Sequence, residues 1–233
     1  MKYDIILLDA DDTLFDYGLA ESRALENAFL QFGLPAGAQE YGESYKTINS
    51  ALWRDLEQGI ITSAALRVER FQRLFTEHRL ELDPAAFSEA YLRHLGAGTY
   101  LIQGAEELCR ELEGCTLAVI TNGITEVQRS RIQGSPLHST FRQVIISELA
   151  GSQKPEPGIF DYAFRELGLT AADKPRTLMV GDSLTSDIKG GNGYGIDTCW
   201  FNPLGKPGRS DIAPTYEIRE LAELPPIIRG ERA

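Results

Sequence analysis

The chain has 233 residues, of which 42% are hydrophobic and 24% are charged, a composition that excludes an intrinsically disordered protein. Its 34 acidic residues outnumber the 23 basic ones, and the net charge of −11 disfavours binding to a nucleic acid polymer or an anionic membrane. A phosphate-bearing ligand would therefore need a locally positive site.

The three cysteines, Cys109, Cys115 and Cys199, show no metal-binding spacing and cannot all pair within one chain. We interpret them as small buried side chains in a reducing compartment. The sequence has no apolar stretch near the ~20 residues that cross a bilayer, and its start shows no signal-peptide pattern. These features predict a cytoplasmic protein without a membrane partner, and they leave the oligomeric state open.

The predicted elements alternate between strands and helices through most of the chain. Continuous apolar runs indicate strands buried on both faces at 5–8, 117–120, 144–146, 177–180 and 198–201, with a weaker sixth at 216–218. Helical patterns lie at about 103–113, 124–134, 156–168, 184–192 and 219–224. This alternation predicts an α/β fold with a Rossmann-like parallel sheet.

Residues 18–98 interrupt the alternation. Apolar side chains recur on one helical face at 24–32, 66–75 and 87–95, and helix starts are indicated at Ser63 and at Asp83 followed by Pro84. We predict an inserted all-helical cap domain at 18–98 and an α/β core domain built from 1–17 and 99–233. The side chains expected in the centre of the cap are Trp53, Phe71, Phe75 and Tyr91.

The first four predicted strands each lead into polar residues. These are Asp9 and Asp11 after the first strand, Thr121 and Asn122 after the second, Lys154 after the third, and Asp182 and Asp187 after the fourth. Because the carboxyl ends of parallel strands share one edge, where open α/β sheets bind ligands, we expect these residues to meet in space.

Carboxylates from Asp9, Asp11 and Asp182 would repel one another unless a cation lies among them. Oxygen ligands in a partly open site favour Mg²⁺, which also accepts substrate phosphate. Lys154 adds a positive charge, Thr121 adds a hydroxyl, and a helix expected to begin at Asn122 offers backbone N–H groups to an anion. This set of residues predicts a small phosphate ester as the substrate.

A reaction follows from this arrangement. Asp9 would attack phosphorus and form an aspartyl-phosphate. Asp11 would protonate the leaving oxygen and later take a proton from the attacking water. Magnesium and Lys154 would offset the repulsion between an anionic nucleophile and the phosphate.

Four segments resemble, in order, the four motifs of the haloacid dehalogenase superfamily of phosphatases. They are Asp9–Leu14, Thr121–Asn122, Lys154–Pro155 and Gly181–Asp187. The resemblance covers essentially the whole chain and implies a helical cap of the C1 type. It implies Asp9 as nucleophile, Asp11 as acid and base, and Thr121 and Lys154 on the phosphate. It further implies Mg²⁺ held by Asp9, the Asp11 backbone carbonyl and Asp182, with Asp187 beside them.

Two positions depart from the common pattern. Asp12 stands where many members have glycine, and the Asp-x-Asp-Asp-Thr form, together with residues 197–203, looks like the pyrimidine 5′-nucleotidase branch. That resemblance implies a pyrimidine nucleoside 5′-monophosphate as substrate. Gln153 stands where glycine often precedes the motif lysine, and we expect this change to alter the loop more than the chemistry.

Several residues allow two interpretations. Phe15 and Tyr17, just past the catalytic turn, can contact the substrate or simply pack. Asp12 can bind the metal, but we favour a role in capping backbone N–H groups of the turn. Asp187 can bind the metal directly, but we slightly favour support of Lys154 or of the metal's waters.

Other functions are also compatible with parts of the pattern. A phosphatase or phosphomutase for sugar or other small phosphates would share the same motifs, because these contact only the phosphate. A 2-haloacid dehalogenase needs neither Mg²⁺ nor the second aspartate, so Asp11, Asp182 and Asp187 argue against it. A non-catalytic binding protein is disfavoured because every catalytic position is filled.

Overall fold

The computed structural model describes residues 1–231, and its centre is a six-stranded parallel sheet. The strand order is β3-β2-β1-β4-β5-β6. The bounds are β1 Ile5–Leu8, β2 Thr116–Thr121, β3 Gln143–Ile146, β4 Thr177–Gly181, β5 Asp197–Phe201 and β6 Tyr216–Ile218. All six predicted strands are present, which confirms the predicted fold class. The continuous apolar runs form strands because helices cover both faces of the sheet.

The register aligns the ends of the three central strands. Leu8, the last residue of β1, pairs with Val119 of β2 and with Val180 of β4. Asp9 continues this pattern, since its backbone N–H donates to the Val180 carbonyl at 2.9 Å. The residues that follow β1, β2 and β4 therefore emerge side by side at one edge of the sheet.

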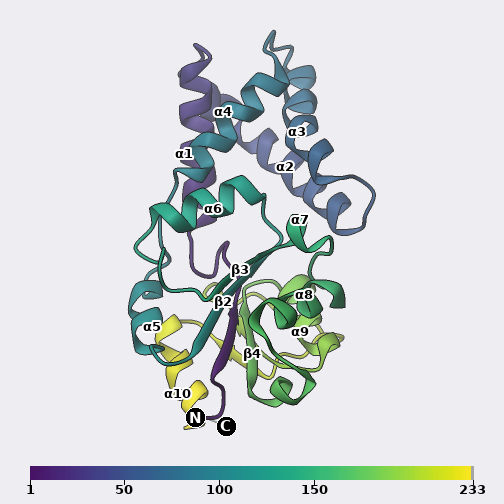
Figure 1. The fold of residues 1–233 in the computed structure, drawn as a ribbon. Coiled ribbons are helices and arrows are strands. Elements are labelled where there is room, and N and C mark those ends of the chain that lie inside the picture. The colour runs from purple at the N-terminus through teal and green to yellow at the C-terminus, as the bar shows by residue number, and fades with distance from the viewer. Residues whose placement is uncertain (232–233) are drawn as a thin grey trace.

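Helices cover the sheet on two sides. In Figure 1, α5 (Ala105–Glu111) and α10 (Leu224–Arg229) lie on one side, and α8 (Pro157–Leu167) and α9 (Lys189–Tyr194) lie on the other. The remaining elements of this part are α6 (Thr125–Gly134), α7 (Ser147–Ala150), η1 (Ala171–Arg176), η2 (Leu184–Ile188) and η3 (Leu221–Glu223). The N-terminus lies beside α10, where the Lys2 N–H donates to the Ile228 carbonyl at 2.9 Å.

Two predicted helices differ from the structure. The helix expected at 184–192 is divided into the π-helical turn η2, where the Ile188 N–H donates to the Ser183 carbonyl, and the short helix α9. The helix expected at 219–224 lies instead at 224–229, after the short turn η3. Pro225 and Pro226 occupy its first turn, where a missing N–H has no cost, so they begin a helix rather than end one.

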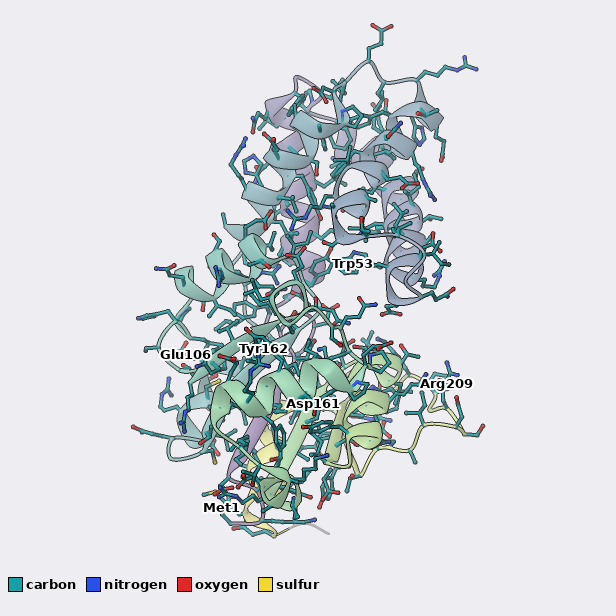
Figure 2. All side chains as sticks on the ribbon, turned by 45° about the vertical axis from the view of Figure 1, so that its right-hand side comes forward. Met1, Trp53, Glu106, Asp161, Tyr162 and Arg209 are labelled. Carbon is teal, nitrogen blue, oxygen red and sulfur yellow. The ribbon has the colours of Figure 1, made fainter. Side chains whose placement is uncertain are left out.

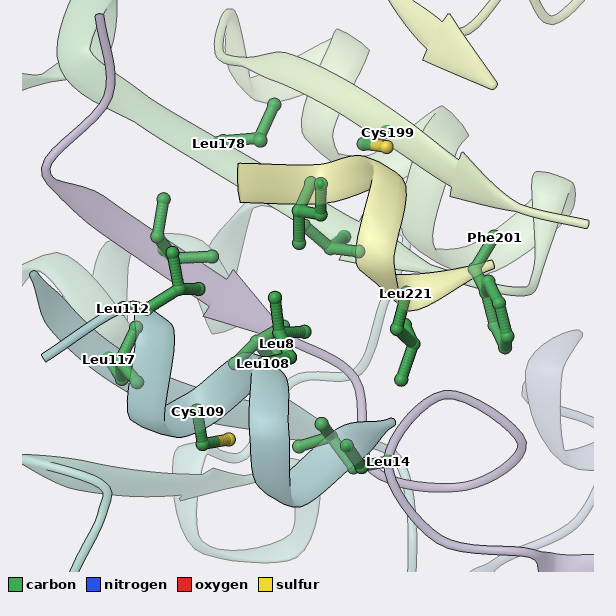
Figure 3. Packing of buried hydrophobic residues seen from close by; sticks show 14 of the residues in the cluster. Leu8, Leu14, Leu108, Cys109, Leu112, Leu117, Leu178, Cys199, Phe201 and Leu221 are labelled. Carbon is green, nitrogen blue, oxygen red and sulfur yellow. The ribbon is translucent and has the colours of Figure 1, made fainter. Parts of the chain in front are cut away.

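The hydrophobic core on one side of the sheet joins α5, η3 and α10 to the strands. Figure 3 shows this packing, and its labelled members include Leu8, Leu108, Cys109, Cys199 and Phe201. Burial raises the pKa of the Cys109 thiol to about 12 and that of Cys199 further still. Both are therefore buried hydrophobic side chains, as predicted, whereas the prediction is wrong for Cys115, which is only half-buried.

Four helices follow β1 and stand together at the carboxyl end of the sheet, at the top of Figure 1. They are α1 (Tyr17–Gln31), α2 (Gly37–Glu57), α3 (Ser63–His78) and α4 (Pro84–Gly96). The predicted helix starts at Ser63 and Pro84 are confirmed. The Thr62 side chain accepts from the Ala65 N–H, and Asp83 accepts from two backbone N–H groups of α4.

Aromatic rings fill the centre of these four helices. Phe71 is fully buried, and its ring lies 4.8–6.1 Å from those of four neighbours, Tyr45, Phe75, Phe87 and Tyr91. The prediction for Trp53 is wrong: its side chain is half-buried at the end of α2 and faces the sheet (Figure 2). None of the helices within residues 1–231 is long and apolar enough to cross a membrane.

Replacing Phe71 with alanine tests the role of the aromatic cluster. Phe71→Ala should lower the free energy of unfolding by about 3–5 kcal/mol, because it removes a fully buried ring and leaves a cavity. Denaturant titration measures the change. Leu30→Ala on α1 is the control: Leu30 is 62% exposed, so its effect should stay within about 0.5 kcal/mol. Equal effects at the two positions would contradict this account of the packing.

Candidate active site

One pocket at the carboxyl edge of the sheet gathers residues that are far apart in sequence. Its volume is about 230 Å³. It is lined by the predicted residues Asp9, Asp11, Tyr17, Thr121, Asn122, Lys154, Asp182 and Asp187, and by Asp12, Trp53, Glu57, Gly123, Ser183 and Ser186. A larger hollow of about 930 Å³ lies between α3, α4 and α6. Five charged residues line it, and Arg67 among them forms ion pairs with Glu126 and Glu148. The predicted site residues line the smaller pocket, which is therefore the candidate site.

Lys154 is the central cation of this pocket. Its ammonium donates to Asp9 Oδ1 at 2.6 Å, to the Ile120 carbonyl at 2.7 Å and to Asp187 Oδ1 at 2.7 Å. Lys154 is 1% exposed, and the two carboxylates hold its pKa above the ordinary value despite burial. All three N–H donors are thus occupied by the protein, and the predicted contact with phosphate would require one of them to be shared.

Asp187 is fixed from both sides of its carboxyl group. Oδ1 accepts from Lys154, and Oδ2 accepts from the Ser183 backbone N–H at 3.0 Å. Gly181 leaves the space for this group, because a Cβ at position 181 would lie 2.2 Å from Asp187 Oδ2. With both oxygens engaged, the geometry favours Asp187 as a support for Lys154.

The carboxylates fit a divalent cation. One oxygen from each of Asp9, Asp182 and Asp187 lies within 4.8 Å of the others, and oxygen-only donor sets suit Mg²⁺. Burial raises the pKa of Asp9 well above its ordinary value; Lys154 opposes this rise, and Asp187 and Asp182 add to it. Burial, followed by Asp187 and Asp12, raises the pKa of Asp182 to about 7. A cation among these groups would favour their ionised forms.

Asn122 positions Lys154 through two hydrogen bonds. Its Nδ2 donates to the Lys154 carbonyl at 2.9 Å, and its Oδ1 accepts from the Lys154 N–H at 2.8 Å. The side chain predicted to bind substrate is thus committed to the loop that carries Lys154. The helix predicted to begin at Asn122 begins instead at Thr125, the first residue of α6. Before it, the Thr121 hydroxyl accepts from the Gly123 N–H at 3.0 Å.

Phe15 and Tyr17 have different surroundings. Phe15 is fully buried in the hydrophobic core and does not line the pocket, which favours the packing interpretation over contact with substrate. Tyr17 lines the pocket, and its hydroxyl donates to Glu21 at 3.0 Å, which fixes the ring. Asp12 adopts a left-handed backbone with φ of 59° and accepts from the Tyr17 N–H at 3.2 Å, as the capping interpretation expects.

The structure adds residues that the sequence did not assign to the site. Trp53 and Glu57, one turn apart at the end of α2, line the wall of the pocket opposite the sheet. Gln128 and Arg131 of α6 both bond to the Asp11 carboxylate. Neither pair belongs to a motif, and only the three-dimensional fold brings Trp53 and Glu57 to the pocket and Gln128 and Arg131 to Asp11.

Gln153 connects the loop of Lys154 to the helical segment. Its amide donates to the carbonyls of Leu56 at 2.9 Å and of Glu57 at 3.3 Å, in the last turn of α2. The glutamine at position 153 therefore does more than change the loop. Its side chain connects the end of α2, which carries Trp53, to the residue that precedes Lys154.

The parallel sheet therefore presents the carboxylates and the buried lysine together at one edge. A family model for haloacid dehalogenase-like hydrolases matches residues 3–195. The chain belongs to this family, and it is an enzyme of the phosphatase type.

Relatives match almost the whole chain. YfnB of Bacillus subtilis (strain 168) is 40% identical over 99% of this chain and 97% of its own length. A crystal structure of YfnB bound to magnesium matches with a TM-score of 0.89 over 98% of this chain and 99% of that one. Two further relatives are named pyrimidine 5′-nucleotidases. PynA of Streptococcus pneumoniae is 37% identical over 96% of this chain and 94% of its own, and YjjG of Escherichia coli is 35% identical over 96% and 97%.

Magnesium should stabilise the folded protein. Saturating Mg²⁺ at about 100 times its Kd should add about 2.7 kcal/mol and raise the Tm of metal-free protein in a thermal melt. Asp182→Asn should reduce this shift, because it removes an anionic ligand. Asp161→Asn, at an exposed position of α8 (Figure 2), should leave it unchanged. A full shift in Asp182→Asn would rule out this site for the metal.

Proposed function

We propose that this protein is a Mg²⁺-dependent phosphomonoesterase that hydrolyses nucleoside 5′-monophosphates, with a preference for pyrimidine bases. The observation that carries the proposal is the convergence of Asp9, Asp182 and Asp187 in one pocket, where Lys154 bonds to Asp9 and Asp187. The names of PynA and YjjG support the nucleotide substrate, since these relatives align over nearly the full length.

The first step is attack by Asp9 on phosphorus. Lys154 holds Asp9 Oδ1 at 2.6 Å, which orients the carboxylate and leaves Oδ2 to approach the phosphate. The Asp9–phosphorus bond forms while the bond to the leaving oxygen breaks, and Asp11 gives that oxygen its proton. Thr121, which lines the pocket, supplies a hydroxyl to the phosphoryl oxygens.

The second step releases phosphate from Asp9. Asp11, now ionised, takes a proton from water as the water oxygen bonds to phosphorus and the bond to Asp9 breaks. Mg²⁺, held by Asp9, Asp182 and the Asp11 backbone carbonyl, with Asp187 adjacent, would supply charge stabilisation for the phosphoryl oxygens.

Recognition of the leaving group is assigned to the helical segment, which we propose acts as a cap domain over the pocket. Tyr17 and Trp53 place two aromatic rings on the pocket wall, and aromatic faces stack on a nucleobase. Glu57 beside them adds a carboxylate that can accept an N–H of the base. Two aromatic walls with one acceptor suit a pyrimidine nucleotide better than a sugar phosphate.

Replacing the nucleophile tests the chemistry. Asp9→Asn should reduce phosphate release from uridine and thymidine 5′-monophosphates to the background of the assay, because a neutral amide cannot form the acyl phosphate. The control is Asp161→Asn at an exposed position, which should retain full activity. The assay measures released phosphate over a panel of nucleotides and sugar phosphates, with and without Mg²⁺. Near-normal turnover by Asp9→Asn would contradict the mechanism. A preference for sugar phosphates would contradict the assignment of a nucleotide substrate.

The aromatic wall predicts a substrate-dependent effect. Trp53→Ala should lower kcat/KM for pyrimidine nucleotides by about 5- to 150-fold, the equivalent of about 1–3 kcal/mol of base stacking. The same variant should hydrolyse glycerol 1-phosphate as well as the wild type, because this ester has no ring to stack. Equal losses on both substrates would assign Trp53 to the general structure of the pocket rather than to base recognition.

A further inference from the structure

The carboxyl group of Asp11 is held by two side chains from α6. Gln128 Nε2 donates to Asp11 Oδ2 at 2.7 Å, and Arg131 Nη1 donates to Asp11 Oδ1 in an ion pair. Each carboxyl oxygen thus has its own donor. Gln128 and Arg131 are three residues apart and lie on one face of the helix.

The two donors are buried, whereas Asp11 reaches the pocket. Gln128 is 1% exposed and Arg131 is 0% exposed, but the Asp11 side chain retains 27% of its surface. A buried arginine is costly unless it has a polar partner, and the Asp11 carboxyl group is the partner of Arg131. The holding groups approach from the protein side and leave the pocket side of Asp11 free.

Neighbouring residues are arranged around this contact. The Arg131 guanidinium lies 5.6 Å from the centre of the Phe15 ring and 6.0 Å from that of Tyr17. A Cβ at position 123 would lie 2.2 Å from Gln128 Nε2, so only Gly123 leaves a path for Gln128 to reach Asp11. The fully buried Phe15 thereby acquires a function as a surface on which the guanidinium rests.

We propose that Arg131 and Gln128 are positioning residues for Asp11, which hold its carboxyl group where it can reach both the leaving oxygen and the attacking water. The inference rests on the proposed function, in which Asp11 gives a proton in the first step and takes one in the second. A freely rotating Asp11 would spend most of its time away from both atoms, and general acid–base catalysis would be lost.

The leaving group separates this role from a structural one. p-Nitrophenolate departs without a proton, so formation of the aspartyl-phosphate from p-nitrophenyl phosphate does not need Asp11. Hydrolysis of the aspartyl-phosphate by water still needs Asp11 as the base. Without a proton a nucleoside would have to leave as a strongly basic alkoxide, so its leaving oxygen needs the proton of Asp11. Both steps on a nucleotide therefore require a positioned Asp11.

Rapid mixing of the Mg²⁺-loaded enzyme with p-nitrophenyl phosphate provides the test. Arg131→Met should give a burst of one p-nitrophenolate per active site, followed by a steady rate about 10²-fold below wild type. The same variant should release nucleoside from uridine 5′-monophosphate about 10²-fold more slowly and without a burst. Gln128→Leu should show the same pattern with smaller losses, and Arg131→Lys should recover part of the rate.

The controls separate the possible failures. Arg129→Met, at an exposed position of the same helix, should behave as wild type in both assays. Loss of the burst together with the steady rate in folded Arg131→Met would show a structural role and overturn the inference. So would wild-type behaviour of folded Gln128→Leu and Arg131→Met. If Asp9→Asn itself retains turnover, the proposed function fails; if Asp9→Asn is inactive and only the burst pattern is absent, the inference alone fails.

Discussion

The buried ammonium group of Lys154 is the interaction on which the rest of the site depends. It joins three separate parts of the chain: Asp9 after β1, the Ile120 carbonyl in β2 and Asp187 in η2. An isolated buried charge costs several kcal/mol, so the fold is stable only when these acceptors converge on it. Asn122 and Gln153 fix the backbone around the lysine, which places the same loop in contact with β2 and with α2.

The charge balance of the pocket links this lysine to the chemistry. One ammonium cannot neutralise Asp9, Asp182 and Asp187, and burial raises the pKa of Asp9 and of Asp182. In the proposed function, a divalent cation would correct the imbalance and would turn a cluster of repelling carboxylates into a site for a phosphate dianion. The carboxyl group of Asp11 is not part of this cluster, because it forms an ion pair with the buried Arg131. An acidic protein can in this way bind an anionic substrate through a small, locally compensated site.

The four helices after β1 complete the pocket from the other side. The end of α2 supplies Trp53 and Glu57, and Gln153 bonds to the carbonyls of Leu56 and Glu57 in the same turn. Groups that would contact the leaving group are thereby connected to the loop that carries Lys154. A shift of α2 would therefore move Trp53 and Glu57 and also the loop that carries Lys154. In the proposed function, this would couple recognition of the leaving group to binding of the phosphate.

The sequence by itself determined the parallel sheet and the polar residues at its edge. Short apolar runs such as 5–8 and 177–180 indicate strands buried on both faces, and the register of parallel strands then brings Asp9 and Asp182 together. Local signals also gave the starts of α3 and α4, since the capping side chains act within one turn. The tertiary structure alone decided the surroundings of Trp53, Arg131 and Phe15. A half-buried tryptophan, a buried arginine and a core phenylalanine have no distinctive spacing in sequence, because their partners lie on other helices and strands.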